Sequence, residues 1–174
     1  NDGTWTYMYD DEGNLTQKSK GFMQETWTYA YDHRNQMTGT SKRATPWGTL
    51  EYIATYTYDV FNNRVKTEEW TTGGSATTTK MTYADSGIAF ADLDSGNDLQ
   101  TRYLYQSTDR YPLVAARIDS GGTAAWLYQD HLGSTRNVVD GTGTLIATVA
   151  YDAFGGITTE SDSTKTGRIT FTGL

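Results

Sequence analysis

Three residues of the chain supply the side chains of a hydrolytic triad. Asp130, His131 and Ser134 provide an acid, a base and a hydroxyl nucleophile. They all lie within five residues, whereas a triad needs side chains that converge from separate elements. The Gly-x-Ser-x-Gly sequence of a nucleophile elbow is absent. We therefore interpret the stretch as a turn, and we predict that the chain is not an enzyme.

A second stretch has the alternating oxygen ligands of a calcium loop. Asp92, Asp94 and Asp98 are its three carboxylates. The fifth position carries no acid, and Tyr103 occupies the twelfth position, where a calcium loop has its closing Glu. We interpret the stretch as a polar loop and keep these three residues as a candidate for weak Ca²⁺ binding. No other metal site and no cofactor is expected, since the chain has two His and no Cys.

Neighbouring carboxylates and exposed aromatic rings suggest sugar chemistry. A glycosidase needs two carboxyl groups facing each other across a cleft, but Asp10-Asp11 and Glu68-Glu69 are adjacent residues, which point to opposite faces of a strand. We expect these pairs at solvated hairpin tips or edges. Trp5, Trp27 and Trp126 are candidates for stacking on sugar rings. The alternative is that each hairpin buries this aromatic face on the next one, and we favour it.

Composition limits the classes of protein to which the chain can belong. Its 174 residues include 31 Thr, 13 Tyr and 18 Gly but only 2 Pro. Thr, Tyr, Trp and Val favour pleated strands, and the aromatic content of 13% argues against disorder. The net charge is −7 and the basic residues are scattered, so we expect neither nucleic acid nor an anionic membrane as a partner. No apolar run is long enough to span a membrane.

The elements that would position these residues form a repeat. Tyrosines recur at steps of 22 to 27 residues, at positions 9, 31, 58, 83, 105, 128 and 151. Alternating runs such as Trp27, Tyr29 and Tyr31 have the period of two that is typical of strands. An Asp that starts a tight turn follows several of them. The sequence predicts an all-β array of antiparallel hairpins, with hairpin loops at 39–46, 71–76 and 160–165.

Particular residues carry the repeat. Asp follows Tyr directly at four places, and the turns contain Gly13, Asn35 and Asn62, which are residue types that accept positive φ. We expect the role of these residues to be architectural. The residues to which we assign this role are Tyr9, Asp10, Gly13, Tyr31, Asp32, Tyr58, Asp59, Tyr128, Tyr151, Asp152 and Gly155.

These motifs resemble a known family. Tyr9 to Thr16 (YDDEGNLT) is similar to the YD repeat of the RHS family, and Tyr58 to Val65 resembles its longer variant. Residues 128–155 together with Phe171-Thr172-Gly173 are similar to the start of the RHS-associated core region. On this resemblance we divide the chain into YD-type repeats at 1–127 and the start of the core region at 128–174.

The resemblance implies a fold and a function. The fold is a long β-ribbon that spirals into a shell wall, and the function is a scaffold in a secreted or cell-surface bacterial protein of the kind that encloses a toxin. We expect the chain to be part of a longer protein, since seven hairpins are few for a closed shell. Expected partners are further hairpins of the parent chain, copies of the chain through open strand edges, an enclosed toxin, or a surface glycan bound by an adhesin module.

Overall fold

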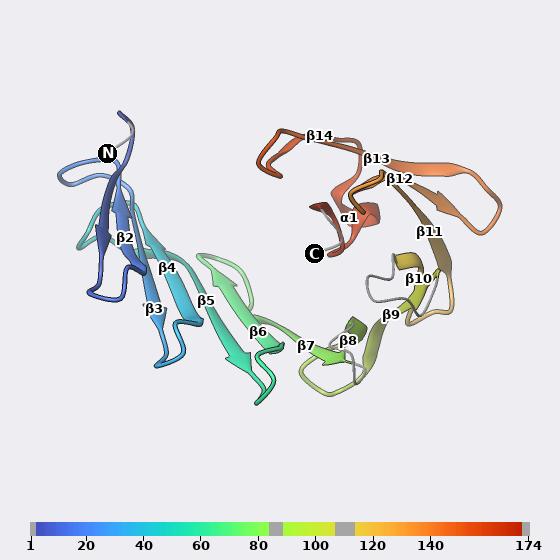
Figure 1. Cartoon of the computed structure of the whole chain (residues 1–174), viewed down its shortest axis with the longest axis horizontal. Coiled ribbons are helices and arrows are strands. Elements are labelled where there is room, and N and C mark those ends of the chain that lie inside the picture. Colours follow the sequence, from blue (N-terminus) through green and yellow to red (C-terminus); the bar gives the residue numbers. More distant parts are fainter. Residues whose placement is uncertain (1–2, 84–88, 107–113, 172–174) are drawn as a thin grey trace. The chain divides into compact units, whose positions relative to one another are not determined.

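The computed structural model describes residues 3–83, 89–106 and 114–171. In these ranges fourteen antiparallel strands form one open sheet whose strand order follows the chain (Figure 1). This confirms the predicted all-β array of hairpins. The elements are β1 (Thr6–Tyr9), β2 (Leu15–Ser19), β3 (Thr26–Tyr31), β4 (Met37–Arg43), β5 (Leu50–Tyr58), β6 (Arg64–Thr71), β7 (Thr77–Tyr83), β8 (Ala89–Leu93), β9 (Leu99–Tyr105), β10 (Val114–Asp119), β11 (Ala124–Gln129), β12 (Thr135–Asp140), β13 (Leu145–Tyr151), β14 (Ile157–Glu160) and α1 (Ser163–Thr166).

Alternation of side chains explains why the strands form where they do. In β3, Trp27, Tyr29 and Tyr31 are half-buried on one face, and Thr28 and Ala30 are exposed on the other. This is the pattern of a sheet with one aromatic and one polar face. In β3 this aromatic face is half-buried, whereas we expected each hairpin to bury its aromatic face on the next one.

Two of the predicted loops contain regular structure. The first, at 39–46, is strand up to Arg43, because Ser41 pairs with Ile53 and Lys42 with Tyr52. The second, at 160–165, contains most of α1, whose N-cap Asp162 accepts a hydrogen bond from the Thr164 N–H at 2.9 Å. Neither segment has an apolar alternation, so its structure comes from pairing and capping.

The chain divides into two compact units. The first consists of Asn1–Thr82 and Asp94–Asn97, and the second of Tyr83–Leu93 and Asp98–Leu174. The predicted division between residues 127 and 128 concerns sequence motifs and stays a prediction. No helix in the described residues is long and apolar enough to cross a membrane.

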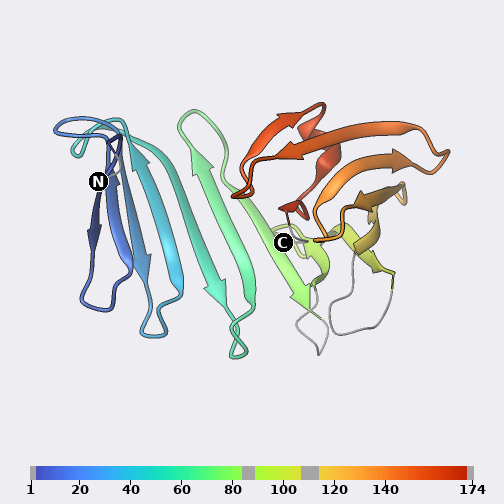
Figure 2. The same cartoon turned by 45° about the horizontal axis from the view of Figure 1, so that its top comes forward.

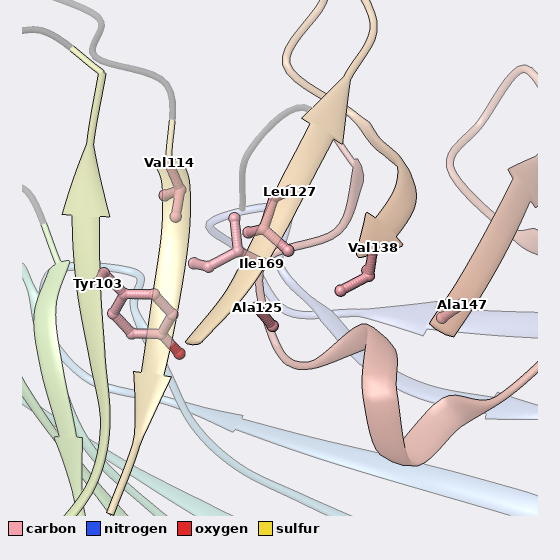
Figure 3. Close-up of a cluster of buried hydrophobic side chains, with 7 residues drawn as sticks. All are labelled: Tyr103, Val114, Ala125, Leu127, Val138, Ala147 and Ile169. Carbon is pink, nitrogen blue, oxygen red and sulfur yellow. The ribbon is translucent and has the colours of Figure 1, made fainter. Parts of the chain in front are cut away.

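The hydrophobic core lies in the second unit. Side chains from β9 to β13 form a cluster there with Ile169, which belongs to the segment after α1 (Figure 3). The cluster consists of Tyr103, Val114, Ala125, Leu127, Val138, Ala147 and Ile169. In the described part of the first unit, only Ala54 and Met81 are fully buried apolar residues.

Candidate functional site

One turn geometry closes hairpin after hairpin. The backbone N–H of its aspartate donates to the carbonyl four residues later, and the carbonyl of the aspartate accepts from the N–H three residues later. In the turn at Asp59 these bonds measure 2.9 and 3.3 Å. The residue at that third position has positive φ, which describes a type I turn followed by a bulge. Between strands, the turns with this last bond begin at Asp10, Asp32, Asp59, Asp94, Asp119, Asp130, Asp140 and Asp152.

The carboxylates of these aspartates are engaged in the turns that they start. Asp32 Oδ1 accepts the Arg34 N–H at 2.8 Å and the Gln36 N–H at 3.0 Å. The Gln36 N–H, with a smaller contribution from Arg34, lowers the pKa of Asp32. At Asp140 the Thr142 hydroxyl and then the Thr144 N–H lower the pKa of the carboxyl group. These carboxylates therefore stabilise backbone, as the repeat in the sequence suggested.

The tyrosine before the aspartate links its hairpin to the previous one. Tyr31 Oη donates to the Leu15 carbonyl at 3.1 Å, Tyr58 Oη to the Met37 carbonyl at 2.9 Å, and Tyr151 Oη to the Thr135 carbonyl at 2.9 Å. In each case the acceptor is the first residue of an earlier return strand. We call this contact the tyrosine link.

Some predicted repeat tyrosines are placed differently. Tyr128 is 59% exposed, because Gln129 occupies the position directly before Asp130 and Tyr128 points to the other face. Tyr9 lies on β1 and is 61% exposed.

Tyr105 makes a tyrosine link to the Ala89 carbonyl, and burial raises its pKa to about 12. The weaker repeat at Tyr83 continues into Ala84 and Asp85, which lie outside the described residues.

Asparagine replaces glycine in some turns and adds a second contact between hairpins. Asn35 and Asn62 have φ values of 60° and 71°, which L-residues rarely adopt. Asn35 Oδ1 accepts from the Asn14 side chain at 3.0 Å, and Asn62 Oδ1 accepts from Arg34 at 3.1 Å. The side chain thus gains a bond to the preceding turn that glycine could not make.

A row of aromatic and basic side chains crosses the first unit. Lys18 on β2 lies opposite Trp27 on β3. Trp27 lies opposite Lys42 on β4, and Lys42 lies opposite Tyr52 on β5. The Lys18 ammonium lies 4.8 Å from the Trp5 ring centroid and 5.3 Å from that of Trp27. Cations thus cover ring faces that a sugar would need. Trp126, the third candidate for sugar stacking, belongs to the second unit and is 48% exposed.

A partly buried ion pair fixes the segment that follows α1. Arg168 contacts both carboxylate oxygens of Asp92, with Nε at 3.0 Å and Nη2 at 2.8 Å. Tyr103 Oη donates to the same carboxylate. Although burial opposes the charge, the contact with Asp92 raises the pKa of Arg168. We call these three residues the carboxylate clamp.

The clamp engages one residue of the calcium candidate, which stays a prediction. Asp92 is 7% exposed, and both of its oxygens are used by Arg168 and Tyr103. Asp94 Oδ1 accepts the Gly96 N–H at 2.8 Å as a turn aspartate. No group of metal-ligating side chains is found among the described residues.

The hydrolytic candidates are also separated by the turn geometry. Asp130 Oδ1 accepts two backbone N–H groups, its Oδ2 accepts from Arg136 at 2.9 Å, and Ser134 is fully buried.

The paired carboxylates have independent partners: Glu68 binds Lys66 at 2.9 Å, and Glu69 accepts the Tyr52 hydroxyl at 2.6 Å. These residues thus stabilise strands and turns.

Comparison with known proteins gives a distant similarity of fold. No protein-family model and no curated protein matches the chain. The chain is similar to the crystal structures of TcdB2–TccC3–Cdc42 and TcdB2–TccC3, both with TM-score 0.40 and 14% identity over 97% of this chain. The Tc holotoxin pore of Photorhabdus luminescens follows with TM-score 0.37 and 14% identity. The chain spans 14–15% of the length of these chains.

Proposed function

We propose that the chain is a non-catalytic scaffold, a length of β-ribbon that forms the wall of a shell. The observation that carries the proposal is the tyrosine link. Tyr31, Tyr58 and Tyr151 each use a polar group to join one hairpin to another, at 2.9–3.1 Å. The aspartates use theirs to close the turns. The repeated polar residues thus build the ribbon.

The biological setting of this scaffold is also a proposal. The YD-type sequence Tyr9-Asp10 and its repeats favour a secreted or cell-surface bacterial protein whose shell encloses a toxin. The partners that we propose are further hairpins of a parent chain, copies of the chain, and the enclosed toxin.

The strand edges give the proposal a test in solution. β1 and β14 stand at the two ends of the strand order, so each has a backbone edge that can accept another strand. Light scattering after size exclusion, over a tenfold range of concentration, measures whether copies add to these edges. We expect the mass to rise with concentration.

A charged variant identifies the edge that is used. Met8 is 55% exposed on β1, and Met8→Lys places a charge at the edge, which should stop strand addition. The matched control is Thr57→Lys, on an exposed position of the inner strand β5. A constant mass near 19.3 kDa for the unmodified chain would contradict assembly from copies.

Glycan binding is a second candidate, supported at Trp126 alone of the three predicted tryptophans. Its ring is 48% exposed, whereas cations lie over Trp5 and Trp27. A shift of tryptophan fluorescence on a glycan panel that disappears in Trp126→Ala would support this function. A panel without any shift would contradict it.

A further inference from the structure

Two turns of the first unit present large apolar side chains to solvent at the same end of its strands. They are the β2–β3 turn at residues 20–25 and the β4–β5 turn at residues 44–49, coloured blue and blue-green in Figures 1 and 2. Phe22 is 87% exposed, Trp47 79% and Met23 44%. The turns are two strand spacings apart, about 10 Å. We call Phe22, Met23 and Trp47 the apolar tips.

Basic residues stand at the base of both turns. Lys18 precedes the first turn and Lys20 begins it, and Lys42 and Arg43 precede the second. Residues 18–25 and 42–51 together contain these four cations and two carboxylates, Glu25 and Glu51. The two segments therefore have a surplus of two positive charges. The whole chain has a net charge of −7. The folded hairpins thus gather cations that are scattered in the sequence.

The contacts show which charges are compensated. Lys20 binds Glu25 at 2.7 Å, and Lys42 binds Glu51 at 3.1 Å. Arg43 instead donates to the Gly48 carbonyl at 2.8 Å, beside Trp47. Lys18 lies over the rings of Trp5 and Trp27. Neither Arg43 nor Lys18 forms a salt bridge within the described ranges, so both supply the positive surplus.

The backbone holds one apolar tip in an unfavourable conformation. Met23 has φ of 58°, a left-handed value that usually belongs to glycine. Its side chain is 44% exposed, so burial in the described structure does not explain a methionine there. Strained residues with exposed apolar side chains are typical of contact sites.

We propose that the apolar tips and their four cations bind the surface of an anionic lipid bilayer. Phe and Trp side chains on protruding turns insert at the level of the headgroups. Lys and Arg beside them are attracted by the negative leaflet. This inference goes beyond the scaffold function, and it reverses the expectation from the sequence that anionic membranes are not partners.

Charge complementarity separates these turns from other exposed aromatic residues. Phe61 is 80% exposed, but it lies in a turn that Asp59 begins, and Phe154 is 95% exposed after Asp152. Residues 59–64 contain Asp59 and Arg64 and have no net charge, and residues 152–157 have one negative charge. Both sites therefore provide controls with similar apolar exposure and no surplus of positive charge.

The test uses the full chain and sedimentation with phosphatidylcholine vesicles, with and without phosphatidylserine. We expect binding only with phosphatidylserine, and we expect it to weaken as salt is added. Phe22→Ser/Trp47→Ser should weaken binding at least about tenfold, because two apolar side chains no longer enter the bilayer. The matched control is Phe61→Ser/Phe154→Ser, which should bind like the unmodified chain.

Three results would overturn the proposal. The first is no sedimentation of the unmodified chain with phosphatidylserine vesicles at low salt. The second is equal binding by the Phe22→Ser/Trp47→Ser variant with unchanged circular dichroism. The third is that this variant binds vesicles as well as the unmodified chain but has a lower mass in solution without vesicles. That result would assign the apolar tips to contact between copies.

Discussion

The repeated tyrosine and aspartate perform different tasks although they are neighbours in sequence. Asp59 closes its own turn by accepting the N–H groups of Phe61 and Asn63. Tyr58 reaches away from that turn to the Met37 carbonyl. One residue therefore defines a hairpin and the other joins two hairpins, which explains why the pair occurs together.

Removing a single phenol oxygen tests the tyrosine link. Tyr58→Phe keeps the ring and leaves the Met37 carbonyl without its donor. We expect the free energy of unfolding to fall by about 0.5–1.5 kcal/mol, as for a typical hydrogen bond. Urea titration measures the change. Tyr128→Phe, at a 59% exposed position, is the control and should change stability by less than about 0.5 kcal/mol. Equal effects at both positions would contradict the link.

The sequence predicts contacts within a turn better than contacts across the chain. The turns at Asp10, Asp32 and Asp59 could be predicted, because the signal lies within five residues. The tyrosine link could not, since its acceptor is a backbone carbonyl that carries no side-chain signal. The spacing of the tyrosines assigns Tyr128 to the repeat, although Gln129 takes the position before the aspartate.

At the scale of elements, the turns make the ribbon sensitive to acid. The pKa values of Asp32, Asp59 and Asp140 are lower in the folded protein than their usual value. The unfolded chain therefore binds more protons at low pH, and acid favours unfolding. This contribution is complete above the unfolded pKa of about 3.9 and is lost as pH falls through the folded values.

We accordingly expect the urea midpoint to stay level from neutral pH to about pH 5 and to fall below about pH 4. Circular dichroism at a series of pH values measures it. In Asp59→Asn/Asp140→Asn the fall should be smaller than in the unmodified chain, since two of the groups no longer titrate. A midpoint that rises on acidification would refute this account.

The carboxylate clamp ties the segment after α1 to strands β8 and β9. Arg168→Met leaves Asp92 buried without its cation. We expect a loss of about 2–4 kcal/mol, at the lower end for a buried pair because the Arg168 side chain is 30% exposed. The double variant Arg168→Met/Asp92→Leu should recover part of the loss, because no unpaired charge remains. Urea unfolding of both variants decides whether the pair acts as a unit.

Asp92 and Arg168 show why this contact could not be predicted. They are 76 residues apart, and the sequence around Asp92 suggested an oxygen-ligand loop instead. Alternate aspartates have the same spacing whether they face a metal ion or a guanidinium group. The structure distinguishes the two cases, because it buries Asp92 beside Tyr103.

At the scale of the whole molecule, apolar burial is unequal between the two units. The second unit contains the cluster around Val138 and Ile169, and the described part of the first has Ala54 and Met81 as its fully buried apolar residues. Since burial of apolar surface is the main stabilising contribution to folding, the units should differ in local stability.

Hydrogen exchange measured by mass spectrometry tests this difference. We expect backbone amides of β11 to β13 to exchange more slowly than those of β2 to β5. Ile169→Ala removes a buried side chain from the cluster, so it should accelerate exchange in β11 to β13 and leave β2 to β5 unchanged. Uniform acceleration across both sets of strands would indicate that the chain opens as one unit.

The tyrosine link also has a consequence for how such a chain can change its length. The phenol of one hairpin needs only the return strand of an earlier hairpin, as Tyr31 needs Leu15 and Tyr58 needs Met37. A duplicated hairpin brings its own phenol and its own acceptor, so gene duplication adds material without leaving an unmatched joint. A deletion of part of a hairpin separates the two groups. Evolution can therefore lengthen or shorten this protein in whole repeats, and insertions of other lengths belong in the turns.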